Sequence, residues 1–296
     1  MFCGACGYSN PPVNRFCVDC GARIGTDPGG AVTDDVSARL SGMPTLPSTE
    51  VVWPGDLPRE VDAKDGTRLR LVPAGFFWMG NKKQKKDERP YHLVYLDSYY
   101  VDETPVTCGQ YQAFVQATGR SAPPGLKALL KTPEGERLPV TSVTWDDAAA
   151  YARWALRRLP TEAEWEKAAR GVDGRLYPWG KDEPTGRANV GPEPGRATPV
   201  GSYPEGRSPF GALDMAGNVW EWCQDTYDQD FYPRANPRNP LCEDGDPRYR
   251  VLRGGSFGYS PFTLRASYRG WNLPHQRVAC YGFRCAVEAS RYRKAR

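Results

Sequence analysis

Four cysteines near the start of the chain have a spacing that suits a metal ion. They form two pairs, Cys3-x2-Cys6 and Cys17-x2-Cys20, and each pair is followed by a glycine. Two thiolates separated by two residues can bind one metal ion, and the glycine allows a tight turn around it. Two such pairs make a closed four-thiolate site with no open position for catalysis. The pattern predicts a structural zinc ribbon over residues 1–22, folded by its metal. A redox dithiol is the alternative, but neither pair lies in a βαβ pattern.

The remaining reactive side chains show no catalytic spacing. Five further cysteines are scattered, and the two histidines stand far apart; these residues are Cys108, Cys223, Cys242, Cys280, Cys285, His92 and His275. His92 falls in an expected strand, which favours a structural role. No nucleophile–base pair or phosphate-binding loop is evident. Because nothing else points to secretion, the cysteines do not indicate a disulfide framework.

Composition and charge limit the number of domains, the expected location and the classes of partner. Its 296 residues suffice for one large domain and a small module. No apolar run could cross a membrane and no signal peptide is evident, so we expect a cytoplasmic location and no membrane partner. Residues 23–58 are rich in Gly, Pro, Ser, Thr and Asp and predict a flexible linker. The net charge of +4 lies partly in a basic tail, residues 291–296, too short to argue for nucleic-acid binding.

The elements that position these groups are short. Thirty-one glycines, 28 prolines and many aromatic residues predict a loop-rich domain over residues 59–290. Short strands closed by a glycine turn are expected over 69–80, and one half-buried strand over 91–101. A capping box at Thr107 and Gln110 predicts a helix that ends at Gly119, and another at Thr161 and Glu164 predicts a helix through 169. A further helix is expected over 146–157, and mostly turns and short strands after 171. The class is therefore α+β.

An ordered set of motifs gives a more specific indication. Among them are Arg158-Leu-Pro-Thr-Glu-Ala-Glu-Trp165, Tyr177-Pro-Trp-Gly180, Asp214-Met-Ala-Gly-Asn-Val-Trp-Glu-Trp222, Val251-Leu-Arg-Gly-Gly-Ser-Phe257 and Gly282-Phe-Arg-Cys-Ala286. From about residue 66 to 287 the chain resembles the formylglycine-generating-enzyme, or sulfatase-modifying factor, superfamily. This resemblance implies a C-type-lectin-like fold.

The resemblance also implies which residues would carry the family's chemistry. The oxidase binds copper through two cysteines shortly after the Arg-Gly-Gly-Ser-Phe motif, and here those positions match Tyr259 and Leu264. Neither can be a thiolate ligand, so we expect a protein that is not an enzyme. The family also implies a possible calcium ion held by Asp214, Gly217, Val219 and Glu221. The alternative is that the two carboxylates only pair with arginines.

A non-catalytic branch of the superfamily matches the end of the chain. Variable proteins of diversity-generating retroelements keep a fixed frame that resembles residues 252–286 here, and a reverse transcriptase rewrites codons between the fixed positions. The resemblance implies these ligand-binding positions: Gly258, Tyr259, Ser260, Phe262, Tyr268, Gly270, Trp271, Leu273, His275, Val278, Ala279, Cys280 and Tyr281. Asn codons rewritten at both adenines can give each of these residues except Trp271, which needs another template codon or is fixed.

This segment predicts a binding function. Large aromatic residues at these positions would contact an unknown protein or surface ligand, while frame arginines such as Arg253, Arg265, Arg269 and Arg284 would bind backbone and carboxylates. Alternatively, the aromatic residues belong to the core. An oxidoreductase of the formylglycine type and a fixed regulatory module recruited through the zinc ribbon remain alternative functions.

Overall fold

Three small β-sheets and four short α-helices make up the part of the chain that the computed structural model describes, residues 51–191 and 195–293. The strands are β1 (Glu60–Asp62), β2 (Arg68–Val72), β3 (Gly75–Met79), β4 (His92–Leu96), β5 (Tyr99–Asp102), β6 (Trp220–Tyr227), β7 (Asp246–Arg253), β8 (Gly270–Asn272), β9 (Tyr281–Gly282) and β10 (Ala286–Glu288). The helices are α2 (Cys108–Thr118), α3 (Leu126–Leu129), α4 (Trp145–Trp154) and α5 (Glu162–Arg170). Within the described ranges, none of these helices is long and apolar enough to cross a membrane.

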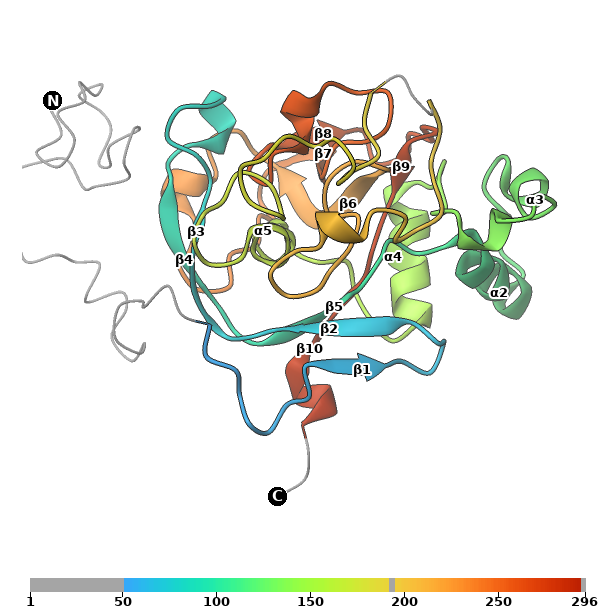
Figure 1. The fold of residues 1–296 in the computed structure, drawn as a ribbon, viewed down its shortest axis with the longest axis horizontal. Helices are drawn as coiled ribbons and strands as arrows, with labels where there is room; N and C mark the ends of the chain where they lie inside the picture. Colours follow the sequence, from blue (N-terminus) through green and yellow to red (C-terminus); the bar gives the residue numbers. More distant parts are fainter. Residues whose placement is uncertain (1–50, 192–194, 294–296) are drawn as a thin grey trace, which may run out of the picture.

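Sheet pairing joins the two ends of the domain. One sheet has the order β1-β2-β5-β10, so the last strand lies beside early strands (Figure 1). A second sheet is the β3–β4 hairpin, and a third has the order β8-β7-β6-β9. In the third sheet β8 is an edge strand, and β6 lies between β7 and β9. This mixture of short strands and short helices confirms the predicted α+β class.

The helices begin where local side chains satisfy their first amides. Both predicted capping boxes are present, at Thr107 with Gln110 and at Thr161 with Glu164. Gly119 closes α2 in the left-handed conformation, as expected for a glycine after a helix. Helix α4 ends earlier than predicted, at Trp154, because the chain turns into the left-handed region at Leu156.

One predicted strand proves to be a pair of strands. The segment 91–101 divides at Asp97 and Ser98 into β4, which pairs with β3, and β5, which pairs with β2 and β10. Residues 93–96 and 99–101 are two apolar runs only two residues apart, so they read as one strand although they join different sheets. The short strands expected over 69–80 are confirmed as β2 and β3.

The domain boundaries differ from the predicted ones at both ends. Residues 51–58, placed in the linker, pack on the domain: Leu57 is buried, and Trp53 contacts Phe210 edge-on with ring centroids 6.2 Å apart. At the other end Tyr292 packs on Tyr100, and Arg293 pairs with Asp56. Apolar and aromatic side chains outside the predicted limits explain both shifts. The zinc-ribbon prediction, with Cys3, Cys6, Cys17 and Cys20, lies outside the described residues, and zinc remains a prediction.

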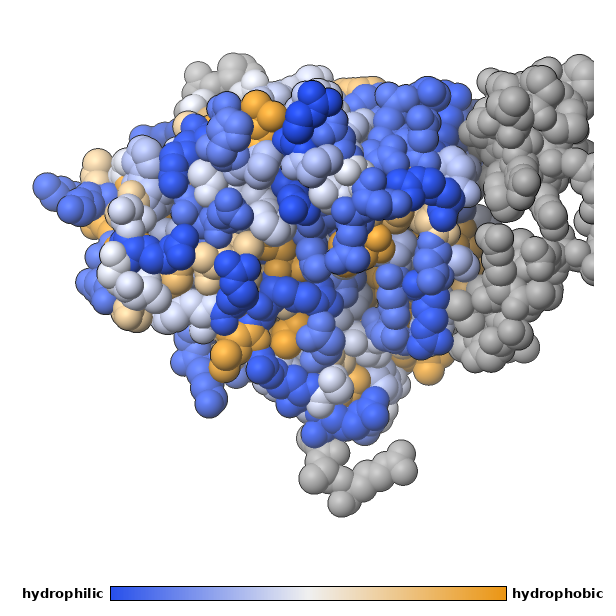
Figure 2. All heavy atoms as spheres, turned by 180° about the vertical axis from the view of Figure 1, so that it is seen from behind, coloured by the Kyte–Doolittle hydropathy of each residue, from blue (hydrophilic) through white to orange (hydrophobic). Residues whose placement is uncertain are grey.

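The surface of the domain is mixed rather than dominated by one apolar area. Figure 2 shows a mainly hydrophilic rear face on which hydrophobic residues form small separate groups. Among the described residues the large hydrophobic side chains left exposed are Val52, Leu156, Tyr259, Phe262 and Trp271. Three of these lie within residues 258–281, so the end of the chain concentrates exposed aromatic surface.

Candidate functional site

A buried arginine on β7 fixes the backbone of the candidate site. Arg253 has no exposed surface and pairs with Glu166 of α5. Its guanidinium also donates hydrogen bonds to the backbone carbonyls of residues 266–268, at 2.7, 3.1 and 2.9 Å. Because a buried guanidinium must find acceptors for its donors, it holds this stretch of chain in one place.

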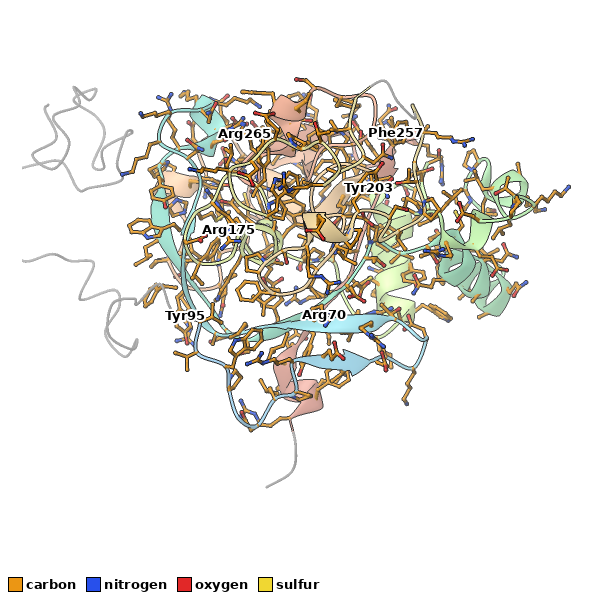
Figure 3. The ribbon with its side chains drawn as sticks, in the orientation of Figure 1. Arg70, Tyr95, Arg175, Tyr203, Phe257 and Arg265 are labelled. Carbon is orange, nitrogen blue, oxygen red and sulfur yellow. The ribbon has the colours of Figure 1, made fainter. Side chains whose placement is uncertain are left out.

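Three more buried arginines anchor the same segment through two-point contacts with carboxylates. Arg265 binds Glu88 at 2.7 and 2.8 Å, and Arg269 binds Glu162 at 2.7 and 2.8 Å. Arg284 binds Glu221 at 2.7 and 2.8 Å and also donates to the carbonyls of residues 102 and 213. These contacts confirm the predicted role of the frame arginines. Figure 3 labels Arg265 in the upper left part of the domain.

Most of the predicted binding positions reach solvent between these anchors. Tyr259, Phe262 and Trp271 expose 41%, 48% and 45% of their surface. The exposed or half-buried positions are Gly258, Tyr259, Ser260, Phe262, Tyr268, Gly270, Trp271, Leu273, His275, Val278 and Ala279. The alternative that the large aromatic residues belong to the core is therefore wrong for Tyr259, Phe262 and Trp271.

Two predicted positions do not face solvent. Cys280 and Tyr281 are each only 7% exposed, because β9 pairs in parallel with the central strand β6 and is covered by packing. The Tyr281 ring meets Trp222 edge-on at 5.4 Å, and its hydroxyl accepts a hydrogen bond from Asn272. These two residues support the surface from beneath rather than presenting a side chain to a ligand.

Gly270 is also unsuited to free variation. A Cβ atom there would lie 2.9 Å from the ring of Trp220 and 3.2 Å from the carbonyl of Leu252. Trp220 is itself buried, so its ring cannot easily move away. The predicted binding role of Gly270 is corrected to that of a close-packing position.

Residues that the sequence did not single out organise the exposed rings. Trp220 lies beneath Tyr259 and Tyr268, with 5.8 Å between ring centroids in each pair, and Phe262 meets Tyr268 at 5.7 Å. Trp271 packs separately between Tyr227 and Tyr249, at 5.4 and 4.7 Å. For Trp220 the sequence did hold a signal, because Trp220 and Trp222 are two residues apart and therefore lie on the same face of strand β6. Tyr227 and Tyr249 carry no such local signal.

The positions that match the family's copper ligands have no thiol. Tyr259 is exposed, whereas Leu264 is fully buried. The nearby Cys280 thiol has a pKa above its usual value, because burial outweighs its hydrogen bonds with Ser256 and Tyr259. All five described cysteines are buried. Within the described ranges, no three His, Cys, Asp or Glu side chains gather into a group that could hold a metal ion.

The two carboxylates of the possible calcium site accept hydrogen bonds from the protein itself. Both oxygens of Glu221 accept hydrogen bonds from Arg284, and one of them also accepts from the Trp165 indole at 2.7 Å. Asp214 is buried and accepts a hydrogen bond from the Gly201 amide; burial raises its pKa to about 6. Both oxygens of Glu221 are thus already bonded, and a calcium ion held by Asp214, Gly217, Val219 and Glu221 stays a prediction. The arginine-pairing alternative describes Glu221.

Curated relatives of the chain include enzymes. The formylglycine-generating enzyme of Streptomyces coelicolor is 35% identical over 303 residues, which cover 80% of this chain and 93% of that enzyme. The serine/threonine-protein kinase pkn1 of Chlamydia pneumoniae is 38% identical over 238 residues, 74% of this chain. The match spans only 38% of the length of that kinase.

Solved structures share the fold. PvdO from Pseudomonas aeruginosa has a TM-score of 0.68 at 28% identity, covering 80% of this chain and all of the other. Treponema denticola variable protein 1 has a TM-score of 0.64 at 23% identity, covering 78% of this chain and 99% of the other. The second likeness shows a shared fold alone and agrees with the expected C-type-lectin-like architecture. The sulfatase-modifying factor enzyme 1-like domain matches residues 56–289, and the chain belongs to that family.

Proposed function

We propose that the chain is a non-catalytic ligand-binding protein whose C-terminal face is diversified by a retroelement. The C-terminal face is defined here as the exposed or half-buried residues Gly258, Tyr259, Ser260, Phe262, Tyr268, Trp271, Leu273, His275, Val278 and Ala279. The observation that carries the proposal is the division of residues 252–286 into buried, hydrogen-bonded frame arginines and exposed positions between them. A chain that must accept many side chains without refolding needs this division.

The frame also favours binding on energetic grounds. Four buried arginines fix the backbone beneath the face, so a ligand meets a surface that is already ordered. Ordering of loops and side chains usually costs part of the affinity, and a preformed surface avoids that cost. Tyrosine, phenylalanine and tryptophan add large contact areas with few rotatable bonds.

The gene itself provides the direct test. Sequencing of its 3′ end and downstream DNA across a population of the source organism is expected to show substitutions concentrated in the codons of the C-terminal face. A near-identical repeat and a reverse-transcriptase gene should lie nearby. Gly270, Cys280 and Tyr281 should show fewer distinct residues than the exposed positions, because each is closely packed. An invariant segment with no repeat would refute diversification.

Two tyrosines of this segment give a matched test of the division between face and frame. We expect Tyr259→Ala to lower the free energy of unfolding by about 1 kcal/mol or less, because the ring is 41% exposed. Tyr281→Ala should cost about 3 kcal/mol, since it removes a buried ring and leaves Asn272 without its partner. Urea denaturation of the two variants measures both values. Equal losses would show that Tyr259 belongs to the core.

An oxidoreductase of the formylglycine type is the second candidate, favoured by the likeness to the Streptomyces coelicolor enzyme. It would require copper-dependent oxygen uptake in the presence of a cysteine-containing peptide. With Tyr259 and Leu264 at the positions of the copper ligands, we expect no uptake above that of copper and peptide alone. Uptake that rises in proportion to the protein would instead establish the enzyme.

A further inference from the structure

The loop that joins β3 to β4 separates its charges between the surface and the interior. This lysine loop, residues 82–89, carries Lys82, Lys83, Lys85 and Lys86. The lysines are exposed or half-buried, whereas Asp87 and Glu88 of the same loop are 4% and 0% exposed. The two carboxylates face inward and Lys82, Lys83 and Lys86 are exposed, whereas the ammonium group of Lys85 lies 3.4 Å from Asp87. The loop therefore presents positive charge to solvent although its own sequence also contains acids.

Several contacts fasten the lysine loop to the C-terminal face. Besides its pairing with Arg265, Glu88 accepts a hydrogen bond from Ser267 at 2.8 Å. Lys85 donates to the carbonyl of Arg269 and lies 4.5 Å from the centroid of the Tyr268 ring. In Figure 1 the lysine loop, with its short 3-10 helix η1 (Lys86–Glu88), and the face segment lie at the same end of the molecule. Lys85 therefore borders the Tyr268 ring, and these contacts hold the loop that carries the other three lysines beside the face.

Lys85 is paired with the buried Asp87, so the charge left to a ligand lies on the exposed Lys82, Lys83 and Lys86. Lys86 lies 3.7 Å from Asp230, but both side chains are about three-quarters exposed, at 76% and 74%. Pairs this exposed are screened by solvent, so they bind weakly and leave the cation open to competition. We propose that the C-terminal face and the lysine loop together bind an acidic polypeptide segment that also carries apolar side chains. Apolar groups would pack on the aromatic rings while carboxylates meet the lysines. This inference rests on the proposed binding function.

The arrangement of the rings favours a polypeptide over single-stranded nucleic acid. Base stacking needs open ring faces, and phosphates need cations along the path of the strand. Here the Arg265 guanidinium lies over the Phe262 ring, 4.1 Å from its centroid, and Trp271 is packed by Tyr227 and Tyr249. The lysines form one border rather than a continuous track. Ring edges suit apolar side chains, and a single basic border suits carboxylates beside them. A polypeptide segment that carries both kinds of side chain therefore fits this surface.

Selection from an unbiased library provides the test. The probe is a displayed library of random 16-residue peptides, offered to the immobilised full chain. Peptides recovered by the natural chain are expected to be enriched in Asp and Glu and to contain apolar residues. For a recovered peptide, Lys82→Gln, Lys83→Gln and Lys86→Gln together should raise Kd about 10-fold or more. The matched control changes the exposed Lys64, Lys127 and Lys131 to Gln and should alter Kd less than 2-fold, although the net charge falls equally.

A second variant has Tyr259, Phe262 and Trp271 all changed to Ala. It separates the proposed binding function of the C-terminal face from the inferred acidic partner. Loss of peptide binding in this variant without loss in the lysine variant would leave the binding face intact and overturn the acidic partner. No loss in either variant would overturn both. Loss in the lysine variant alone would show nonspecific charge attraction and overturn the inference. Recovery of no peptides, or of peptides without enrichment in Asp and Glu, would also overturn the acidic partner. A 16-nucleotide oligo-dT that binds more tightly than the peptide, and that loses binding in both the lysine variant and the aromatic variant, would overturn it as well.

Discussion

Replacement of Arg253 by methionine is expected to lower the free energy of unfolding by about 3–5 kcal/mol, the range typical of breaking a buried ion pair. Arg253 has no exposed surface, and its change would remove one partner of Glu166 and the donors to three carbonyls of residues 266–268. Glu166 depends on this charge. Burial alone raises its pKa, but Arg253 and Arg170 outweigh burial and hold the pKa below its usual value.

A matched control exists on the same strand. Arg248 of β7 pairs with Asp246, but its side chain is 73% exposed. We expect Arg248→Met to leave stability nearly unchanged, because solvent screens exposed pairs. Guanidinium unfolding of both variants measures the difference. A loss below about 1 kcal/mol for Arg253→Met would mean that the buried guanidinium does not hold the frame, and the argument for a preformed face would fail with it.

The sequence predicted the helices better than the strands for a physical reason. A capping box is a local signal, since Thr161 and Glu164 satisfy each other's backbone amides within one turn. Strand pairing is not local. Residues 93–96 and 99–101 are apolar runs only two residues apart, yet β4 and β5 belong to different sheets. Only contacts between distant residues decide where one strand ends.

The same distinction explains the candidate site. Motif resemblance identified the frame arginines, and their carboxylate partners lie between 63 and 177 residues away along the chain. It could not show that Tyr281 is buried, because this depends on the pairing of β9 with β6. Nor did any local pattern show that the lysine loop borders the face. Its acidic residues look like ordinary surface charges until Arg265 and Arg269 are placed beside them.

Lys167 is expected to make stability depend on pH. Its side chain is buried on α5, and its ammonium group donates to the carbonyls of Pro73 and Gly75 at 2.7 and 2.9 Å. Burial lowers its pKa to about 7, although Asp97 and Glu164 act in the opposite direction. The usual value is 10.5. Between these two values the unfolded chain binds more protons than the folded one, so the free energy of unfolding should rise with pH over this range.

Lys167→Met isolates this contribution, because methionine keeps an apolar stem of similar length and does not titrate. The stability of the natural chain relative to the variant should increase by about 2 kcal/mol between pH 7 and pH 9, and change little below pH 6. Other titrating groups, including the cysteines, are common to both proteins and cancel in the difference. Lys127→Met, at an exposed position, should give a curve parallel to that of the natural chain. Urea unfolding at pH 6, 7, 8 and 9 provides the measurement. Parallel curves for Lys167→Met as well would mean that Lys167 keeps an ordinary pKa, and that its two carbonyl contacts compensate for its burial.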